Sequence, residues 1–121
     1  MREILFRGKI GKDWVYGGYC KDSNGTYIMT NDLSISQHTK VKSVSVGQYT
    51  GFQDINVVKI FEGDVVTFPD GEALTVKWQP VSGAWKLVGN DYKCLCLQRN
   101  MELCTVIGNI YDNPELLEGK K

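Results

Sequence analysis

The residues of this chain whose types could support chemistry are four cysteines, one histidine and one close pair of carboxylates. Cys94 and Cys96 stand two residues apart, so on a β-strand both side chains would point to one face, with too little reach for the usual paired zinc knuckle. A zinc site would have to recruit Cys104 or Cys20 from elsewhere in the chain. We therefore predict no metal site and expect these thiols to be small buried hydrophobic side chains.

The single histidine, His38, would have to serve any histidine-based dyad or triad, but no serine or cysteine motif stands nearby. An exposed loop position is the simpler interpretation of this residue. Glu62 and Asp64 could act as paired carboxylates, yet they flank Gly63 directly before an apolar strand, where a tight turn explains all three residues. The segment 47–51 lacks the Gly-Lys-Ser/Thr ending of a phosphate-binding loop. We predict no catalytic residue, no cofactor and no enzyme activity.

The elements that position these residues are short β-strands. Runs rich in Val, Ile, Tyr, Phe, Trp and Thr recur between Gly, Asn, Asp and Pro, which predicts an all-β sandwich or barrel. The expected strands are Glu3–Phe6, Trp14–Cys20, Thr26–Met29, Lys42–Val46, Val65–Phe68, Leu74–Trp78, Trp85–Val88, Cys94–Leu97 and Leu103–Tyr111.

Three connections have a recognisable local chemistry. Asn24-Gly25 would supply the positive-φ residues of a tight hairpin. The polar stretch Thr30–Thr39 has no strong period, so we expect an irregular loop there. Near the end of the chain, Asn113 as N-cap and Pro114 at the first helical position predict a short C-terminal helix.

Length and charge limit the classes of function. A chain of 121 residues is long enough to bury one core without disulfides or metals, so we predict a single domain over residues 1–121. Fourteen Lys and Arg balance fourteen Asp and Glu, which disfavours a general DNA-coating role because such proteins usually carry a basic surplus. No stretch has the length of a membrane span and the first residues do not resemble a secretory signal, so we expect a cytoplasmic protein with reduced thiols and no membrane partner.

Basic and aromatic residues mark a candidate binding surface. Positive charge gathers near the N-terminus, and a local basic patch and ordinary solvated charge both account for it. The candidate surface comprises Arg7, Lys9, Lys12, Trp14, Tyr16, His38, Lys40 and Lys42. A second aromatic group could form a stacking platform for a single strand or a peptide, but alternation along strands makes most of its members core residues. Its members are Tyr49, Phe52, Phe61, Phe68, Trp78 and Trp85.

Three segments together resemble the YopX family of phage and prophage proteins. They run from Arg2-Glu3-Ile4-Leu5-Phe6-Arg7-Gly8 to Trp14-Val15-Tyr16-Gly17, from Val46-Gly47-Gln48-Tyr49-Thr50-Gly51 to Ile60-Phe61-Glu62-Gly63-Asp64-Val65-Val66, and over Ile107-Gly108-Asn109-Ile110-Tyr111-Asp112-Asn113-Pro114-Glu115-Leu116-Leu117. The resemblance implies a compact, mainly β fold of several short coiled antiparallel sheets that includes a small Src-homology-3-like barrel. It also implies a phage or prophage origin, a core that Trp14, Tyr16, Tyr49, Phe61 and Tyr111 help to fill, and no particular activity.

One departure from the family pattern concerns the hairpin after Asp54. Where relatives carry a Lys-Asn-Gly-like turn, this chain has Ile55-Asn56-Val57-Val58, without the glycine. We expect this hairpin to be reshaped and Ile55, Val57 and Val58 to be partly exposed.

Two functional hypotheses follow. The first is a non-enzymatic phage accessory protein that binds a host bacterial protein through the segment Thr30–Lys40. The alternative is weak binding of single-stranded nucleic acid by a small barrel. In that case Trp14 and Tyr16 would be framed by Arg2, Arg7, Lys9, Lys12, Lys40 and Lys42. We also expect that exposed edge strands and apolar residues such as Val57 and Val58 could support a homo-oligomer.

Overall fold

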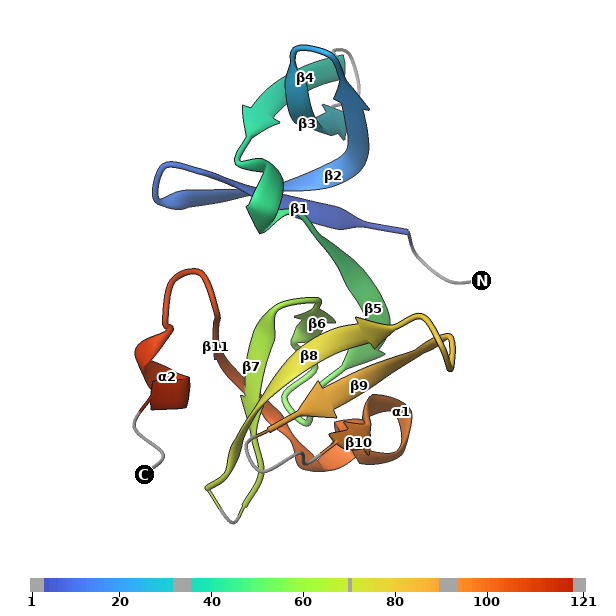
Figure 1. Cartoon of the computed structure of the whole chain (residues 1–121), viewed down its shortest axis with the longest axis vertical. Helices are drawn as coiled ribbons and strands as arrows, with labels where there is room; N and C mark the ends of the chain where they lie inside the picture. Colours follow the sequence, from blue (N-terminus) through green and yellow to red (C-terminus); the bar gives the residue numbers. More distant parts are fainter. Residues whose placement is uncertain (1–3, 32–35, 70, 90–93, 119–121) are drawn as a thin grey trace. The chain divides into compact units, whose positions relative to one another are not determined.

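The computed structural model describes residues 4–31, 36–69, 71–89 and 94–118. The chain forms two compact units, residues 1–49 and 50–121 (Figure 1). Antiparallel strands dominate both units, which confirms the predicted mainly β class. The assignment of the chain as one domain over residues 1–121 stays a prediction.

The first unit is built from the strands drawn in blue to teal in Figure 1. They are β1 (Phe6–Ile10), β2 (Asp13–Asp22), β3 (Gly25–Asn31) and β4 (Ser36–Val41), followed by the 3₁₀ turn η1 (Ser43–Ser45) and the start of β5 (Gly47–Gln53). Their hydrogen-bonded order is β4-β3-β2-β1-β5, and β6 (Lys59–Phe61) follows β5 in the same sheet.

The strand β2 is long because two partners use different halves of it. Its first half pairs with β1, from Asp13 opposite Ile10 to Gly17 opposite Phe6. Its second half, from Gly18 to Asp22, pairs with β3. The sheet therefore folds over at the Gly17-Gly18 step, where a Cβ on Gly17 would collide with the carbonyl oxygen of Met29.

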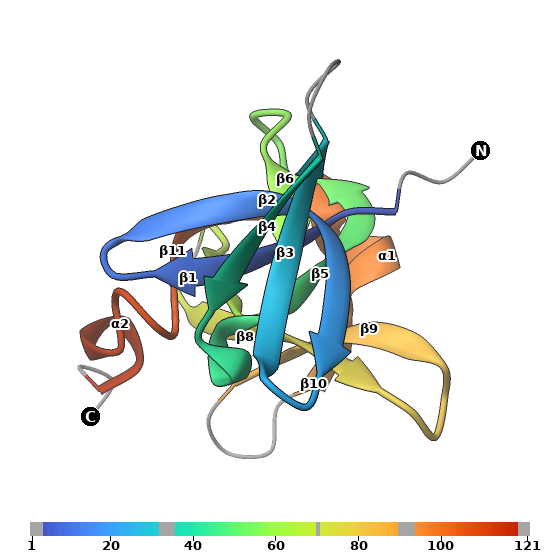
Figure 2. The ribbon, with the colours of Figure 1, turned by 90° about the horizontal axis from the view of Figure 1, so that it is seen from above.

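The bend of β2 at Gly17-Gly18 brings β1 across the inner face of β3 and β4, and Figure 2 shows the three strands crossing. A Cβ on Gly8 would lie 2.7 Å from Cγ2 of Val41 and 3.0 Å from Cγ1 of Ile28. The Lys42 amide donates to the Lys9 carbonyl at 3.0 Å and holds the two layers together. Because Ile28 and Val41 are buried, the small core of the first unit lies between these layers.

The second unit contains a sheet of order β10-β9-β8-β7-β11. After β5 the elements are β6 (Lys59–Phe61), β7 (Asp64–Thr67), β8 (Ala73–Gln79), β9 (Ala84–Val88), β10 (Cys94–Cys96), α1 (Leu97–Asn100), η2 (Met101–Leu103), β11 (Thr105–Asn109) and α2 (Glu115–Glu118). The core consists of apolar side chains from the sheet, β6, α1 and the residue before β11. These are Ile60, Val66, Leu74, Val76, Trp85, Leu87, Leu97 and Cys104.

The carboxylates of the sequence 62–64 belong to a turn, as predicted. Gly63 has φ +89°, a conformation that other residues rarely adopt. The buried Asp64 accepts a 2.7 Å hydrogen bond from the Phe61 amide through Oδ2. The ring of Tyr111 lies so close to Gly63 that a Cβ there would be 3.0 Å from Cε2. Gly63 and Asp64 are therefore explained by the structure of the turn, without a catalytic role.

Several predicted strands are confirmed and others need correction. Strands form within two residues of the predicted bounds around residues 14–20, 26–29, 65–68, 74–78, 85–88 and 94–97, and β11 is the shorter core of the predicted strand 103–111. The predicted strand 42–46 is wrong, because it holds the turn η1. The predicted first strand is shifted, since β1 begins at Phe6, and residues 1–3 lie outside the described residues.

Two further expectations are corrected by the pairing pattern. The predicted irregular loop instead contains most of β4, which pairs with β3 from Thr26 opposite Val41 to Asn31 opposite Ser36. The described strands do not close into a barrel, so the Src-homology-3-like barrel is not confirmed, because β4 hydrogen-bonds as a strand to β3 alone. A third correction concerns the hairpin at residues 22–25, where Asn24 and Gly25 were both expected to have a positive φ. Only Gly25 has one, +152°, and Asp22 Oδ1 accepts hydrogen bonds from the amides of Asn24 and Gly25.

The predicted buried side chains divide in the same way. Tyr49, Phe61 and Trp85 are buried as expected. Tyr16 is 46% exposed and Trp78 is 44% exposed, so the expectation that they lie in the core is wrong. Trp78 packs edge-on against Trp85 at 5.0 Å between ring centroids. Cys104 is buried, but Cys94 is exposed, so the prediction of buried thiols is wrong there. Cys94 lies on β10, the terminal strand of its sheet, where the described strands provide a neighbour on one side only.

Candidate functional site

The described residues contain no cluster of side chains suited to binding a metal ion. No group of three or more His, Cys, Asp or Glu side chains there could hold a metal ion. Burial raises the pKa of Cys104 to about 11, and the nearby Asp54 carboxylate adds to the rise. A thiol with so high a pKa is a poor nucleophile at neutral pH. Among the described helices, none has the length and apolar character needed to cross a membrane.

The first group of predicted binding residues lies on the outer face of the β1–β2 hairpin. Arg7 lies opposite Tyr16 and Lys9 lies opposite Trp14, so all four side chains share a face. The guanidinium carbon of Arg7 is 4.4 Å from the Trp14 ring centroid, and Lys9 Nζ is 5.4 Å from it. Arg7 is buried while Tyr16 is 46% exposed. The Trp14 ring is therefore already engaged by cations and is not an open platform for base stacking.

The second group lies on the outer face of β3 and β4, and we call it the β3–β4 face. Tyr27 is opposite Lys40 and Met29 is opposite His38, so the four side chains point to the same side. The rings of Tyr27 and His38 meet edge-to-face at 6.3 Å between centroids. His38 and Lys40 are exposed, and Tyr27 and Met29 are half-buried. Cys20, opposite Tyr27 on β2, borders this face.

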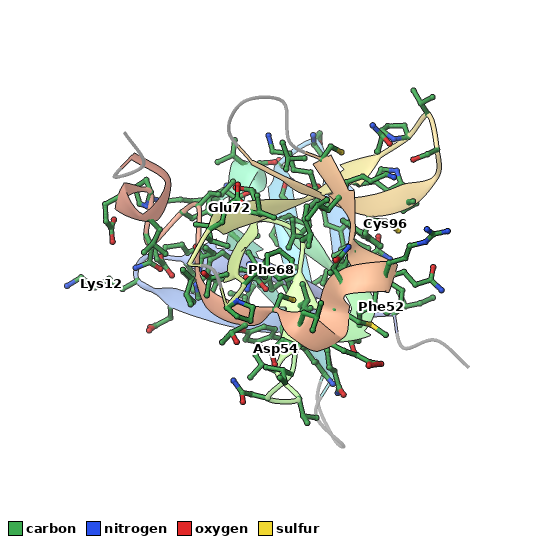
Figure 3. All side chains as sticks on the ribbon, turned by 90° about the horizontal axis from the view of Figure 1, so that it is seen from below. Lys12, Phe52, Asp54, Phe68, Glu72 and Cys96 are labelled. Carbon is green, nitrogen blue, oxygen red and sulfur yellow. The ribbon has the colours of Figure 1, made fainter. Side chains whose placement is uncertain are left out.

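The fold separates the two groups. Because β1 packs its inner face against the inner faces of β3 and β4, the two outer faces point away from each other. Lys12 lies in the β1–β2 turn, where it projects from the hairpin tip (Figure 3). Lys42 is exposed just beyond β4, and Arg2 lies outside the described residues. The predicted surface is thus two surfaces, of which the β3–β4 face contains the exposed His38 and Lys40.

The edge formed by β4 adds a second property to this face. β4 is the terminal strand of its sheet, and on its other side the described part of the chain supplies no paired strand. Beyond β4 the chain is tied back by the Thr26 and Ser43 hydroxyls, whose oxygens are 2.6 Å apart. An edge strand presents backbone donors and acceptors that can bind an extended segment of another chain. The β3–β4 face thus combines backbone pairing capacity with an aromatic ring and a cation.

Sequence reasoning found His38 and Lys40 but missed Tyr27 and the edge strand. The available signal was the alternation of outward His38 and Lys40 with inward Thr39 and Val41. It was weak because Val41 is the only apolar residue among them. A polar edge strand has little of the periodic hydrophobicity on which strand prediction depends.

Comparisons with known proteins agree with this architecture. The sequence model of a family described as "YopX protein" matches residues 6–118. The chain belongs to the YopX family. A crystal structure of protein EF1440 from Enterococcus faecalis is similar to this YopX protein, with a TM-score of 0.63 and 20% sequence identity over 97% of this chain and 99% of that one. At that identity the likeness concerns the fold alone. A search of the curated proteins found no relative that matches the chain.

Proposed function

We propose that this YopX protein is a non-enzymatic binding module whose partner is a protein and whose contact surface is the β3–β4 face with the open edge of β4. The observation that carries the proposal is the edge strand β4 itself, which bears the exposed side chains of His38 and Lys40. The proposal keeps the segment predicted from the sequence and identifies its described part as a strand rather than a loop.

The chemistry of the face indicates what kind of segment it would bind. The side chain of Lys40 reaches the turn between β2 and β3, where a Cβ on Gly25 would be 2.6 Å from Lys40 Cε. With Lys42 exposed just beyond the strand, the edge has a local positive charge although the whole chain is neutral. Charges on an edge strand limit indiscriminate pairing. A partner strand with acidic side chains opposite Lys40 would form hydrogen bonds with the backbone groups at the edge of β4 and would neutralise the positive charge of Lys40.

Single-stranded nucleic acid is the second candidate. Stacking sites need open aromatic faces beside cations. Here the Trp14 ring is occupied by Arg7 and Lys9, whereas Lys40 lies on the β3–β4 face, which points away from Trp14. The zero net charge also gives little counterion release. These observations support the protein partner over the nucleic acid.

The finer expectations concern origin and partner. Family resemblance implies a phage or prophage origin, and a protein of this kind would act in the cytoplasm of the bacterial host. A host bacterial protein is therefore the partner class to test first. The proposal of a binding role rather than a catalytic one is supported by the sequence motifs, none of which predicts a catalytic residue, and by the lack, among the described residues, of a side-chain cluster that could hold a metal ion.

The experiment is a tagged-protein pull-down from bacterial lysate, with and without nuclease, read by mass spectrometry. Three forms are compared: the natural chain, the variant His38→Glu/Lys40→Glu, and Lys12→Glu as the control at the distant hairpin tip. A nuclease-resistant partner that the double variant loses and the control retains supports the proposal. Recovery of oligonucleotide without such a partner would favour the nucleic-acid candidate, and equal capture by all three forms would exclude the β3–β4 face.

A further inference from the structure

The loop between β5 and β6 contains an unusual backbone conformation. Val57 has φ +64° and is the only non-glycine residue with positive φ in the described ranges. A β-branched side chain is strained in the left-handed region, where glycine or asparagine would be accommodated easily. The sequence thus keeps valine at a position where folding favours another residue.

The side chains of this loop contribute little to folding because they face solvent. The exposed fractions are 59% for Ile55, 69% for Val57 and 46% for Val58. This confirms the expectation that these residues are partly exposed. Backbone strain in exchange for an exposed apolar group is typical of sites where the group makes a contact with another molecule.

A buried carboxylate holds the loop in one conformation. Asp54 is 5% exposed, and its Oδ1 accepts the amides of Asn56 at 2.8 Å and Val58 at 2.9 Å. Its Oδ2 accepts the Val106 amide at 2.8 Å, which ties the loop to β11. Figure 3 labels Asp54 where the loop meets this part of the chain. The apolar side chains are therefore presented in a preorganised arrangement, which lowers the entropic cost of binding.

Two further exposed apolar side chains lie on segments that are hydrogen-bonded to this loop. The Ile55 amide donates to the Cys104 carbonyl at 3.1 Å, and Leu103, the residue before Cys104, is 57% exposed. Ile107 follows Val106 at the irregularity in the pairing of β11 and is 42% exposed. We call the set of Ile55, Val57, Val58, Leu103 and Ile107 the apolar loop surface.

We propose that the apolar loop surface is an interface between two copies of this chain. A surface of uncharged aliphatic side chains is complementary to itself, which is the requirement for a two-fold symmetric interface. The chain also has no net charge, so copies do not repel one another at long range. This surface belongs to the second unit and is distinct from the β3–β4 face, which belongs to the first.

The test uses sedimentation velocity of the full chain over a wide range of concentrations, with thermal unfolding of the same samples. Val57→Gly removes both the strain and the exposed side chain. It should weaken dimerisation about tenfold or more, and it should raise the melting temperature in samples dilute enough for both forms to be monomeric, where dimerisation adds nothing to stability. Val81→Gly is the matched control, because Val81 is 97% exposed in the β8–β9 turn. It should leave dimerisation unchanged.

A rise in melting temperature together with weaker dimerisation would distinguish an interface role of Val57 from a role in folding alone. A natural chain that stays monomeric at every concentration would overturn it, as would equal weakening by Val57→Gly and Val81→Gly. A monomer that binds another protein through this surface would assign the surface to a different occupant and also reject the proposal.

Discussion

Replacing Asp54 with alanine should be strongly destabilising although the residue lies in an exposed loop. The substitution removes the acceptor of three backbone amides, those of Asn56, Val58 and Val106. A buried donor left without an acceptor costs about 1–3 kcal/mol. Some of these amides can reach water once the loop relaxes, so we expect the free energy of unfolding to fall by about 3 kcal/mol in total. That is a large share of the roughly 5–15 kcal/mol typical of a domain.

The assay is urea denaturation followed by tryptophan fluorescence, with Asp22→Ala as the control. Asp22 also accepts two amides in a turn, but these hydrogen bonds are exposed, so water replaces the lost carboxylate. The control should change the free energy of unfolding by about 1 kcal/mol or less. If Asp54→Ala cost no more than Asp22→Ala, the argument from burial would be wrong.

Two further predictions concern the glycine fold and the thiols. Gly17→Ala should lower the free energy of unfolding by about 2 kcal/mol or more, because the new Cβ would collide with the Met29 carbonyl. Gly18→Ala is the control, because a Cβ there meets nothing within 4 Å. In the same denaturation assay its free energy of unfolding should stay within about 0.5 kcal/mol of that of the natural chain. Alkylation by iodoacetamide at pH 8 should modify the exposed Cys94 well before the buried Cys104, whose raised pKa of about 11 keeps it protonated; rapid labelling of Cys104 in the folded protein would refute this.

The raised pKa of Cys104 also predicts a pH dependence of stability. In the unfolded chain the thiol ionises near the ordinary cysteine pKa of 9.0, whereas in the folded chain it stays protonated up to about 11. Between these values the folded state binds more protons, so the free energy of unfolding falls as pH rises. Cys104→Ser should reduce this slope in urea denaturation measured from pH 8 to 11, and an unchanged slope would contradict the assignment.

The fold was predictable from sequence wherever apolar alternation was strong. The strands around Val65, Leu74 and Trp85 each have inward residues that form the core of the second unit. Prediction failed at β4 and η1, because the polar strand is stabilised by pairing with β3 and the 3₁₀ turn by local hydrogen bonds such as Ser45 Oγ to the Lys42 carbonyl. Neither segment shows the periodic hydrophobicity from which strands and helices are predicted.

The candidate site was predictable in part for a related reason. His38 and Lys40 could be selected by residue type, but their separation from Trp14 and Tyr16 depends on the fold of β2 at Gly17-Gly18. Residue types alone do not report on which side of a folded sheet a strand lies. The role of Asp54 was missed for a similar reason, since its partner Val106 is 52 residues away along the chain.

The most direct test of the proposed function is hydrogen–deuterium exchange of the β4 amides, measured for the protein alone and for the complex recovered by pull-down. An added strand along the edge of β4 would protect amides in residues 38–41, and the His38→Glu/Lys40→Glu variant would lose that protection. Protection confined to the outer face of the β1–β2 hairpin, with unchanged exchange in β4, would contradict the account.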